Sequence, residues 1–287
     1  MLSANREYYV VGKDIPLKQI TYQFLLDFEA HLLGTGVKVN SIGGYMRHLR
    51  AIINQAISED MLNQEDYPFK KFRIKKEKTA KRAISKDAIL QIINCEVGDD
   101  PALQKSQDLF TFMFHTRGMN FVDLAHLRIQ DVSEGRIIYR RQKTGKMYNI
   151  KLTDVAIEII AFYSKHRNFH PTDYVFPVIP SDVLGNKEKE WKRIVEARKQ
   201  FNINLKRLAK LCGLHVNLTS YVIRHSWASI AKFSGIAPAV IGESLGHSDL
   251  KTTETYLAQF EHDILDKAND IIVGTMDKKS LVDPLFL

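Results

Sequence analysis

Three side chains near the C-terminal end of this 287-residue sequence are of types that could together break a phosphodiester bond. Arg224 lies in Y-V-I-R-H-S-W, His247 follows 23 residues later in S-L-G-H-S, and Tyr256 comes nine residues after that in T-E-T-Y-L. A tyrosine oxygen can attack phosphorus, but its ordinary pKa of about 10 requires neighbouring cations. A guanidinium can bind two phosphate oxygens at once. We therefore expect Tyr256 to be the nucleophile, with Arg224 and His247 beside the phosphate.

Lys143 is the candidate proton donor to the leaving group. Residues 135–152 alternate in polarity and turn at Thr144-Gly145, which predicts a β-hairpin with Lys143 at its tip. From there its ammonium group could enter a minor groove and protonate the leaving 5′ oxygen. His247 would donate to a phosphate oxygen or accept the phenol proton. Each residue type also has a structural alternative: tyrosines fill cores, arginines form salt bridges, and hairpin lysines are commonly solvated.

Most elements that must position these residues are predicted to be helices. Ser85 is a typical N-cap, and Gly246 is expected to end the helix that precedes His247. Apolar spacing predicts helices near residues 103–114, 154–166, 187–212, 219–234, 237–245 and 250–260. The expected fold class is therefore mainly α with a small β-sheet or hairpin.

The N-terminal part predicts a separate pair of helices. Apolar residues recur every four positions from Ile20 until Gly34 and Gly36, and a second helix is expected after Ser41. Its expected buried side holds Ile42, Tyr45, Met46, Leu49, Ile52, Ile53, Ala56 and Ile57. The opposite side is basic, and a merely solvated face is the alternative interpretation.

Residues 70–82 form the most basic segment, with eight basic side chains among thirteen residues. The segment has no helical or strand periodicity, so we expect an extended linker that lies along phosphates, although such runs are also found simply solvated. The candidate DNA contacts of this segment and of the basic helix face are Arg47, Arg50, Lys70, Lys71, Arg73, Lys75, Lys76 and Lys78.

Length and composition agree with a two-domain protein that binds a polyanion. The sequence is 45% hydrophobic and long enough for two cores, and its net charge of +8 with a pI near 9.3 favours nucleic acid over a membrane surface. We expect a cytoplasmic, nucleoid-associated protein, because no long uncharged apolar run occurs. The sequence shows no metal-ligand spacing and no phosphate-cradling glycine motif, so no metal and no cofactor are expected.

The order and spacing of these residues resemble the tyrosine recombinase (phage integrase) family over nearly the whole chain. The stretch R-G-M-N-F-V-D-L-A-H-L, which begins at Arg117, looks most like integrases of conjugative transposons and related mobile elements. By motif match, the family's second arginine falls on Arg224, its histidine or tryptophan on His247, its hairpin lysine on Lys143 and its nucleophile on Tyr256. The resemblance implies a site-specific DNA recombinase that cuts and rejoins strands through a covalent 3′-phosphotyrosine.

The resemblance also implies a domain organisation and an assembly. After a lead-in of residues 1–16, a helical, SAM-like core-binding domain over residues 17–79 and a mixed, mostly helical catalytic domain over 80–287 would clamp double-stranded DNA. Four protomers would assemble around two DNA sites, with a monomer in solution as a further state. The tail over residues 262–287 would pack on a neighbouring protomer or fold back on its own domain.

Two positions depart from the family pattern. The His-x-x-Arg motif is here Tyr221-Val-Ile-Arg224, and a tyrosine can donate a hydrogen bond to phosphate but cannot act as a histidine-like base. Asn120 stands where the family has its first arginine, with Asp123 at the usual acidic position. Arg117 comes one helical turn earlier, about 4.5 Å along the axis of a continuous helix. We therefore expect Arg117 to supply the missing guanidinium.

Two other functions fit the same residues. A type IB topoisomerase-like enzyme uses similar chemistry to relax supercoils as a monomer. A catalytically inactive DNA-binding relative would explain the substitutions at Asn120 and Tyr221. The sequence leaves the DNA site and the direction of reaction open, and residues 1–16 also fit a linker that follows a missing arm-binding domain.

Overall fold

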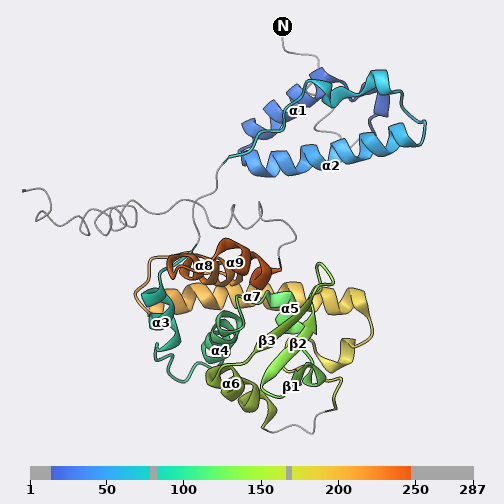
Figure 1. Ribbon diagram of the computed structural model, residues 1–287. Coiled ribbons are helices and arrows are strands. Elements are labelled where there is room, and N and C mark those ends of the chain that lie inside the picture. Colours follow the sequence, from blue (N-terminus) through green and yellow to red (C-terminus); the bar gives the residue numbers. More distant parts are fainter. Residues whose placement is uncertain (1–13, 78–82, 166–169, 247–287) are drawn as a thin grey trace, which may run out of the picture. The chain divides into compact units, whose positions relative to one another are not determined.

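The computed structural model describes residues 14–77, 83–165 and 170–246. The chain divides into two compact units, with the boundary between Ala80 and Lys81 (Figure 1). In the described residues, no helix combines the length and the apolar character needed to cross a bilayer.

The first unit is built on two packed helices, α1 (Tyr22–Gly34) and α2 (Val39–Ser58). The Thr21 side chain caps α1 by accepting a hydrogen bond from the Phe24 amide. The helix expected after Ser41 begins three residues earlier, at Val39, and two of its predicted core residues are wrong. Tyr45 and Ile52 are 51% and 55% exposed, because they face away from the core formed by the other apolar positions of α2.

The basic segment is partly folded onto this unit. Phe69 and Phe72 are buried in its core with their rings in edge contact, and residues 72–77 have neither helical nor strand structure. Asn40 and Glu77 exchange two hydrogen bonds between the Asn40 side-chain amide and the Glu77 backbone. The predicted lack of helix and strand is therefore confirmed for residues 72–77. This part of the expected linker belongs to the first unit, because apolar side chains and Asn40 hold it against α2.

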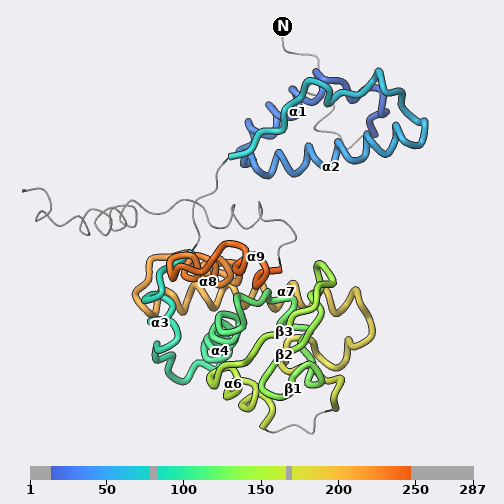
Figure 2. Tube along the Cα trace, viewed as in Figure 1, coloured from blue at the N-terminus to red at the C-terminus, as the bar shows by residue number. Residues whose placement is uncertain are grey.

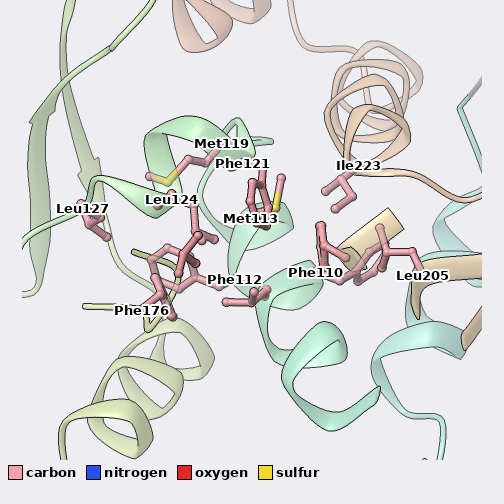
Figure 3. Packing of buried hydrophobic residues seen from close by; sticks show 14 of the residues in the cluster. Phe110, Phe112, Met113, Met119, Phe121, Leu124, Leu127, Phe176, Leu205 and Ile223 are labelled. Carbon is pink, nitrogen blue, oxygen red and sulfur yellow. The ribbon is translucent and has the colours of Figure 1, made fainter. Parts of the chain in front are cut away.

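The second unit is mostly helical, as predicted. Its helices are α3 (Lys86–Ile93), α4 (Pro101–His115), α5 (Phe121–Ala125), α6 (Asp154–Ser164), α7 (Lys187–Leu211), α8 (Ser220–Phe233) and α9 (Pro238–Leu245). Helix α4 is central and packs against α3, α6, α7 and α8. Figure 3 shows Phe110 of α4 beside Leu205 of α7 and Ile223 of α8, while Phe112 of α4 faces Phe176.

A three-stranded antiparallel sheet lies beside the helices. The strands β1 (Val132–Ser133), β2 (Arg136–Arg140) and β3 (Met147–Lys151) pair in the order β1-β2-β3. The predicted hairpin is confirmed: Tyr139 of β2 pairs with Tyr148 of β3, and their rings stack inside the core. The two-residue strand β1 was not predicted.

The hairpin turn and the end of α9 lie close together, as the trace in Figure 2 shows. Helix α9 ends at Gly246, which adopts the left-handed conformation with φ 64°. The predicted role of Gly246 as a helix stop is therefore confirmed. A Cβ at this position would fall on the hydroxyl group of Tyr148 in β3, so the close approach also requires glycine. The helix expected over 250–260 lies outside the described residues.

Candidate active site

A pocket of about 720 Å³ opens in the second unit. Its walls come from the start of α5, the turn after β2, the middle of α7 and the start of α8. The lining residues are Asn120, Phe121, Val122, Asp123, Arg141, Gln142, Lys143, Trp191, Arg198, Asn202, Thr219, Ser220, Tyr221 and Arg224. Segments far apart in the sequence therefore contribute four cationic side chains to one concave surface: Arg141, Lys143, Arg198 and Arg224. Such a surface is a common setting for an active site.

Arg224 is fixed in the pocket wall by backbone carbonyl groups. The residue is 4% exposed; its Nη1 donates to the Gly118 carbonyl oxygen at 3.0 Å, and its Nη2 donates to that of Leu245. Gly118 has a φ of 66°, and a Cβ there would meet the Arg224 Cα at 2.8 Å. Glycine thus allows the turn before α5 to approach α8 closely. These acceptors are neutral, so they orient the guanidinium without cancelling its charge.

Asp123 is the acidic group of the pocket. It is buried in α5, and its Oδ1 accepts a hydrogen bond from the Gln142 amide at 2.9 Å. Burial raises the pKa of the Asp123 carboxyl, while the Gln142 hydrogen bond and the charge of Arg141 act in the opposite direction. A hydrogen bond from the Asn120 side chain and the charge of Arg224 also lower this pKa. Asn120 therefore supports the carboxylate and adds no charge of its own.

Arg141 is a second buried guanidinium in the pocket. It is 9% exposed, and its Nη1 donates to the carbonyl oxygens of Leu245 and Gly246 at 3.2 and 3.4 Å. Its Nε lies 3.8 Å from the Asp123 Oδ2. Arg141 and Arg224 therefore share the Leu245 carbonyl oxygen, which places the donating nitrogens within roughly 6 Å of each other, two hydrogen-bond lengths.

Sequence reasoning missed Arg141, although strand periodicity held the signal. Ile137 and Tyr139 are buried on β2, and Arg141 continues the same alternation. An arginine in phase with buried strand residues is a buried charge, which is rare without a partner or a function. Arg198 on α7 is a further missed cation; it is half-buried in the pocket wall.

The predicted position of Arg117 rests on a helix that the structure does not contain. Helix α4 ends at His115, and Arg117 lies in the following turn with a φ of 59°, while Asn120 is the N-cap of α5. The prediction of one helical turn between them is therefore wrong, because two consecutive left-handed residues, Arg117 and Gly118, end the helix. Arg117 belongs to the described residues but not to those that line the pocket.

Lys143 and Tyr221 both line the pocket. Lys143 is exposed in the hairpin turn, and Tyr221 is 41% exposed at the start of α8. The Tyr221 ring is in edge contact with that of His225, with ring centroids 4.3 Å apart. Both side chains are accessible to a molecule that enters the pocket.

Two of the predicted catalytic residues and one predicted DNA contact fall outside the described residues. These are His247, Tyr256 and Lys78. The other predicted DNA contacts are exposed on the first unit: Arg47, Arg50, Lys70, Lys71, Arg73, Lys75 and Lys76. Lys75 differs from the rest because its Nζ forms an ion pair with the largely buried Glu29 at 2.8 Å.

Comparisons with known proteins identify the protein family that shares this architecture. Residues 82–262 match the phage integrase family, and residues 4–74 match the phage integrase SAM-like domain. Tyrosine recombinase XerD of Rhizobium meliloti is 26% identical over 84% of this chain and 78% of that protein. Tyrosine recombinase XerA of Pyrococcus furiosus is 26% identical over 80% of this chain and 74% of that protein.

Solved structures with low sequence identity share the fold. The Tn1549 transposon integrase in complex with circular intermediate DNA superposes with a TM-score of 0.62 at 16% identity, covering 89% of this chain and 86% of that one. The XerH site-specific recombinase bound to palindromic difH superposes with a TM-score of 0.65 at 17% identity, covering 90% and 71%. The fold class is confirmed, and the family match spans most of the chain. The protein belongs to the phage integrase family and is a tyrosine-type site-specific DNA recombinase.

Proposed function

We propose that the pocket binds one scissile phosphate of double-stranded DNA and that Tyr256 attacks it. The observation that carries this proposal is the convergence of buried guanidinium groups at the Leu245 carbonyl, at the end of the helix that precedes His247 in sequence. A permanently charged, preorganised donor stabilises the negative charge that develops on phosphate oxygens during attack. Burial strengthens this interaction because little water screens it.

In the proposed step, the Tyr256 oxygen forms a bond to phosphorus and the bond from phosphorus to the 5′ oxygen breaks. The phenol proton passes to a base, for which His247 is the candidate, and the 5′ oxygen takes a proton from the Lys143 ammonium group. The products are a 3′-phosphotyrosine and a free 5′-hydroxyl. Rejoining reverses the step with a second 5′-hydroxyl as nucleophile, so the bond energy is conserved and no nucleotide cofactor is required.

Lys143 suits the role of proton donor because it is exposed at the edge of the same pocket. Tyr221 also lines the pocket, and we propose that its hydroxyl group donates one hydrogen bond to the bound phosphate. Its phenol replaces the family's histidine in binding but supplies no imidazole base.

The first unit would act as the core-binding half of a clamp around the DNA. Its exposed basic side chains, Arg47, Arg50, Lys70, Lys71, Arg73 and Lys76, would neutralise phosphates without reading sequence. Exchange of strands between two sites requires four nucleophiles, so we propose a tetramer on DNA, with residues 262–287 docking on a neighbouring protomer. A chain with these partners would act at the nucleoid.

A nicked suicide substrate tests this function directly. Loss of the short downstream strand prevents rejoining, so the wild-type chain should accumulate a covalent protein–DNA adduct that survives denaturation. A plasmid with two target sites should yield exchange products. Relaxation of site-free plasmid without exchange would favour a topoisomerase, and the absence of any adduct on a bound site would favour an inactive DNA-binding relative.

A further inference from the structure

The position of the family's first arginine holds a neutral residue in this chain. Asn120 begins α5 and hydrogen bonds to Asp123, so it adds no positive charge to the pocket. We propose that Arg141, at the end of β2, supplies the second guanidinium that binds the scissile phosphate. This inference rests on the proposed function, since it assigns a catalytic residue to the same phosphate.

Arg141 has the location that this role requires. It lines the same pocket as Arg224 and donates to the same Leu245 carbonyl oxygen. It also lies beside Asp123, the acid that the resemblance pairs with the first arginine. The carboxylate and its cationic partner are thus both present, but the cation comes from the hairpin instead of from the N-terminus of α5.

The hydrogen bonds of Arg141 leave donors for a ligand. Among the described residues, its side-chain hydrogen bonds come from Nη1. Its buried Nε faces the Asp123 carboxylate at 3.8 Å, and its Nη2 forms no hydrogen bond with the described residues. A guanidinium nitrogen without an acceptor is costly in a buried residue, and a phosphate oxygen that enters the pocket offers one to Nη2. A planar guanidinium can hold a carbonyl through one nitrogen and a phosphate through another.

A purely structural role is the competing explanation. The carbonyl groups of Leu245 and Gly246 end α9, and a cation at a helix C-terminus stabilises the helix without any part in catalysis. Such a role needs a hydrogen-bond donor at this point, but it does not depend on the charge of the substrate. The two explanations therefore differ in how the loss of Arg141 responds to the charge of the phosphate.

Arg141→Gln separates the two roles. The glutamine amide can still donate to a carbonyl group, but it carries no charge. Cleavage is measured on a nicked suicide substrate with either an ordinary phosphodiester or a neutral methylphosphonate at the scissile position. We expect Arg141→Gln to lose about 10²–10³ in cleavage rate on the phosphodiester, the scale for one preorganised donor. On the methylphosphonate it should stay within about tenfold of the wild type, because little charge then needs stabilising.

Controls make the outcome specific to Arg141. Arg136→Gln is the matched variant, because Arg136 lies on β2, the strand that precedes Arg141, and its side chain bonds to Asn149 and does not line the pocket. This variant should cleave both substrates like the wild type. The double variant Asn120→Arg/Arg141→Gln should recover about tenfold or more on the phosphodiester, because it returns the charge to the family's usual position. Tryptophan fluorescence checks folding through Trp191 and Trp227, the two tryptophans of the chain.

The proposal fails if Arg141→Gln cleaves the phosphodiester like the wild type, or is impaired equally on both substrates. It also fails if Arg117→Ala, and not Arg141→Gln, cleaves the phosphodiester slowly but cleaves the methylphosphonate at a rate near that of the wild type. If Arg141→Gln does not fold, Arg141→Lys keeps a charged donor for the carbonyl groups and is tested in its place. It should lose about tenfold on the phosphodiester alone, because a lysine cannot form the bidentate contact. In each case an adduct formed by the wild type shows that the proposed function itself still holds.

Discussion

At the scale of single residues, the site depends on buried cations that neutral backbone groups hold in place. Arg141 and Arg224 are nearly inaccessible, and burying a charge is costly unless it is paired or hydrogen-bonded. Here the carbonyl groups of Gly118, Leu245 and Gly246 accept hydrogen bonds from the two guanidinium groups, and the Asp123 carboxylate lies 3.8 Å from the Arg141 Nε. The free-energy cost of removing these guanidinium groups from water is therefore met when the protein folds, before DNA binds.

Gly118 is the residue that lets Arg224 occupy this position. We predict that Gly118→Ala destabilises the second unit more than Gly98→Ala. Both glycines have positive φ values, 66° and 61°, but a Cβ at Gly98 meets nothing within 4 Å. Gly98→Ala should therefore cost about 1–2 kcal/mol for the left-handed backbone. Gly118→Ala should cost about 1–3 kcal/mol more, the scale of overpacking.

Denaturant unfolding followed by fluorescence measures both variants, since Trp191 and Trp227 belong to the second unit. Gly118→Ala should also slow cleavage, because relief of the contact moves Arg224. Equal destabilisation by the two substitutions would show that the close approach of Gly118 to Arg224 has no energetic consequence.

At the scale of elements, the sequence predicts best where local chemistry decides the structure. Ser85 caps α3, Gly246 ends α9, and the hairpin turns where alternation stops. Prediction from the sequence fails where contacts between residues distant in sequence determine the local structure. The turn at Arg117 requires positive φ in a non-glycine residue, which propensity disfavours and which only tertiary packing maintains.

The candidate site shows the same division between local and distant signals. Arg224 and Lys143 could be placed from motifs, because their neighbours in sequence carry the pattern. Arg141 could not be recognised as a partner of Asp123 by motif, since the contact joins a strand end to a helix and only the fold brings them together. Periodicity on β2 indicated its burial but not its partner.

Lys75 belongs to the architecture of the first unit more than to its DNA-binding surface. We predict that Lys75→Ala increases amide hydrogen exchange in α1 and α2, by an amount corresponding to about 1 kcal/mol, because it leaves the Glu29 carboxylate with no ion-pair partner. This figure is small because the Lys75 side chain is 61% exposed and solvent screens the pair. Lys76→Ala is the matched control, since Lys76 is exposed beside it.

Adding Glu29→Gln to Lys75→Ala should return exchange toward the wild-type level, because the unpaired charge is then removed. If Lys75→Ala and Lys76→Ala change amide hydrogen exchange in the two helices equally, the Lys75–Glu29 ion pair contributes nothing to the stability of this unit.

At the scale of the whole molecule, we propose that the two units act on one DNA duplex. The second unit carries the pocket, whereas the exposed basic residues of the first carry no chemistry of their own. Phosphate contacts release counterions and give binding a steep salt dependence. This division of roles between the two units predicts that charges on the first unit govern the affinity for DNA, while charges in the pocket govern the rate of DNA cleavage.

We therefore predict that Arg73→Ala/Lys76→Ala flattens the plot of log binding constant against log salt concentration by about 1.8, at about 0.9 for each lost phosphate contact. Lys165→Ala/Lys187→Ala removes the same charge from exposed positions outside the pocket and should change the slope little. Fluorescence anisotropy with a labelled duplex measures both. An equal change in the two double variants would mean that net charge alone governs binding.

In the proposed reaction a single tyrosine, Tyr256, becomes covalently attached to DNA. The most direct measurement is mass spectrometry of the peptides released from the trapped adduct after proteolysis and nuclease digestion. We predict that the nucleotide is attached to the peptide that contains Tyr256, and that Tyr256→Phe binds the duplex but yields no adduct. Attachment to Tyr221, the exposed tyrosine that lines the pocket, or an adduct that persists in Tyr256→Phe, would contradict the account.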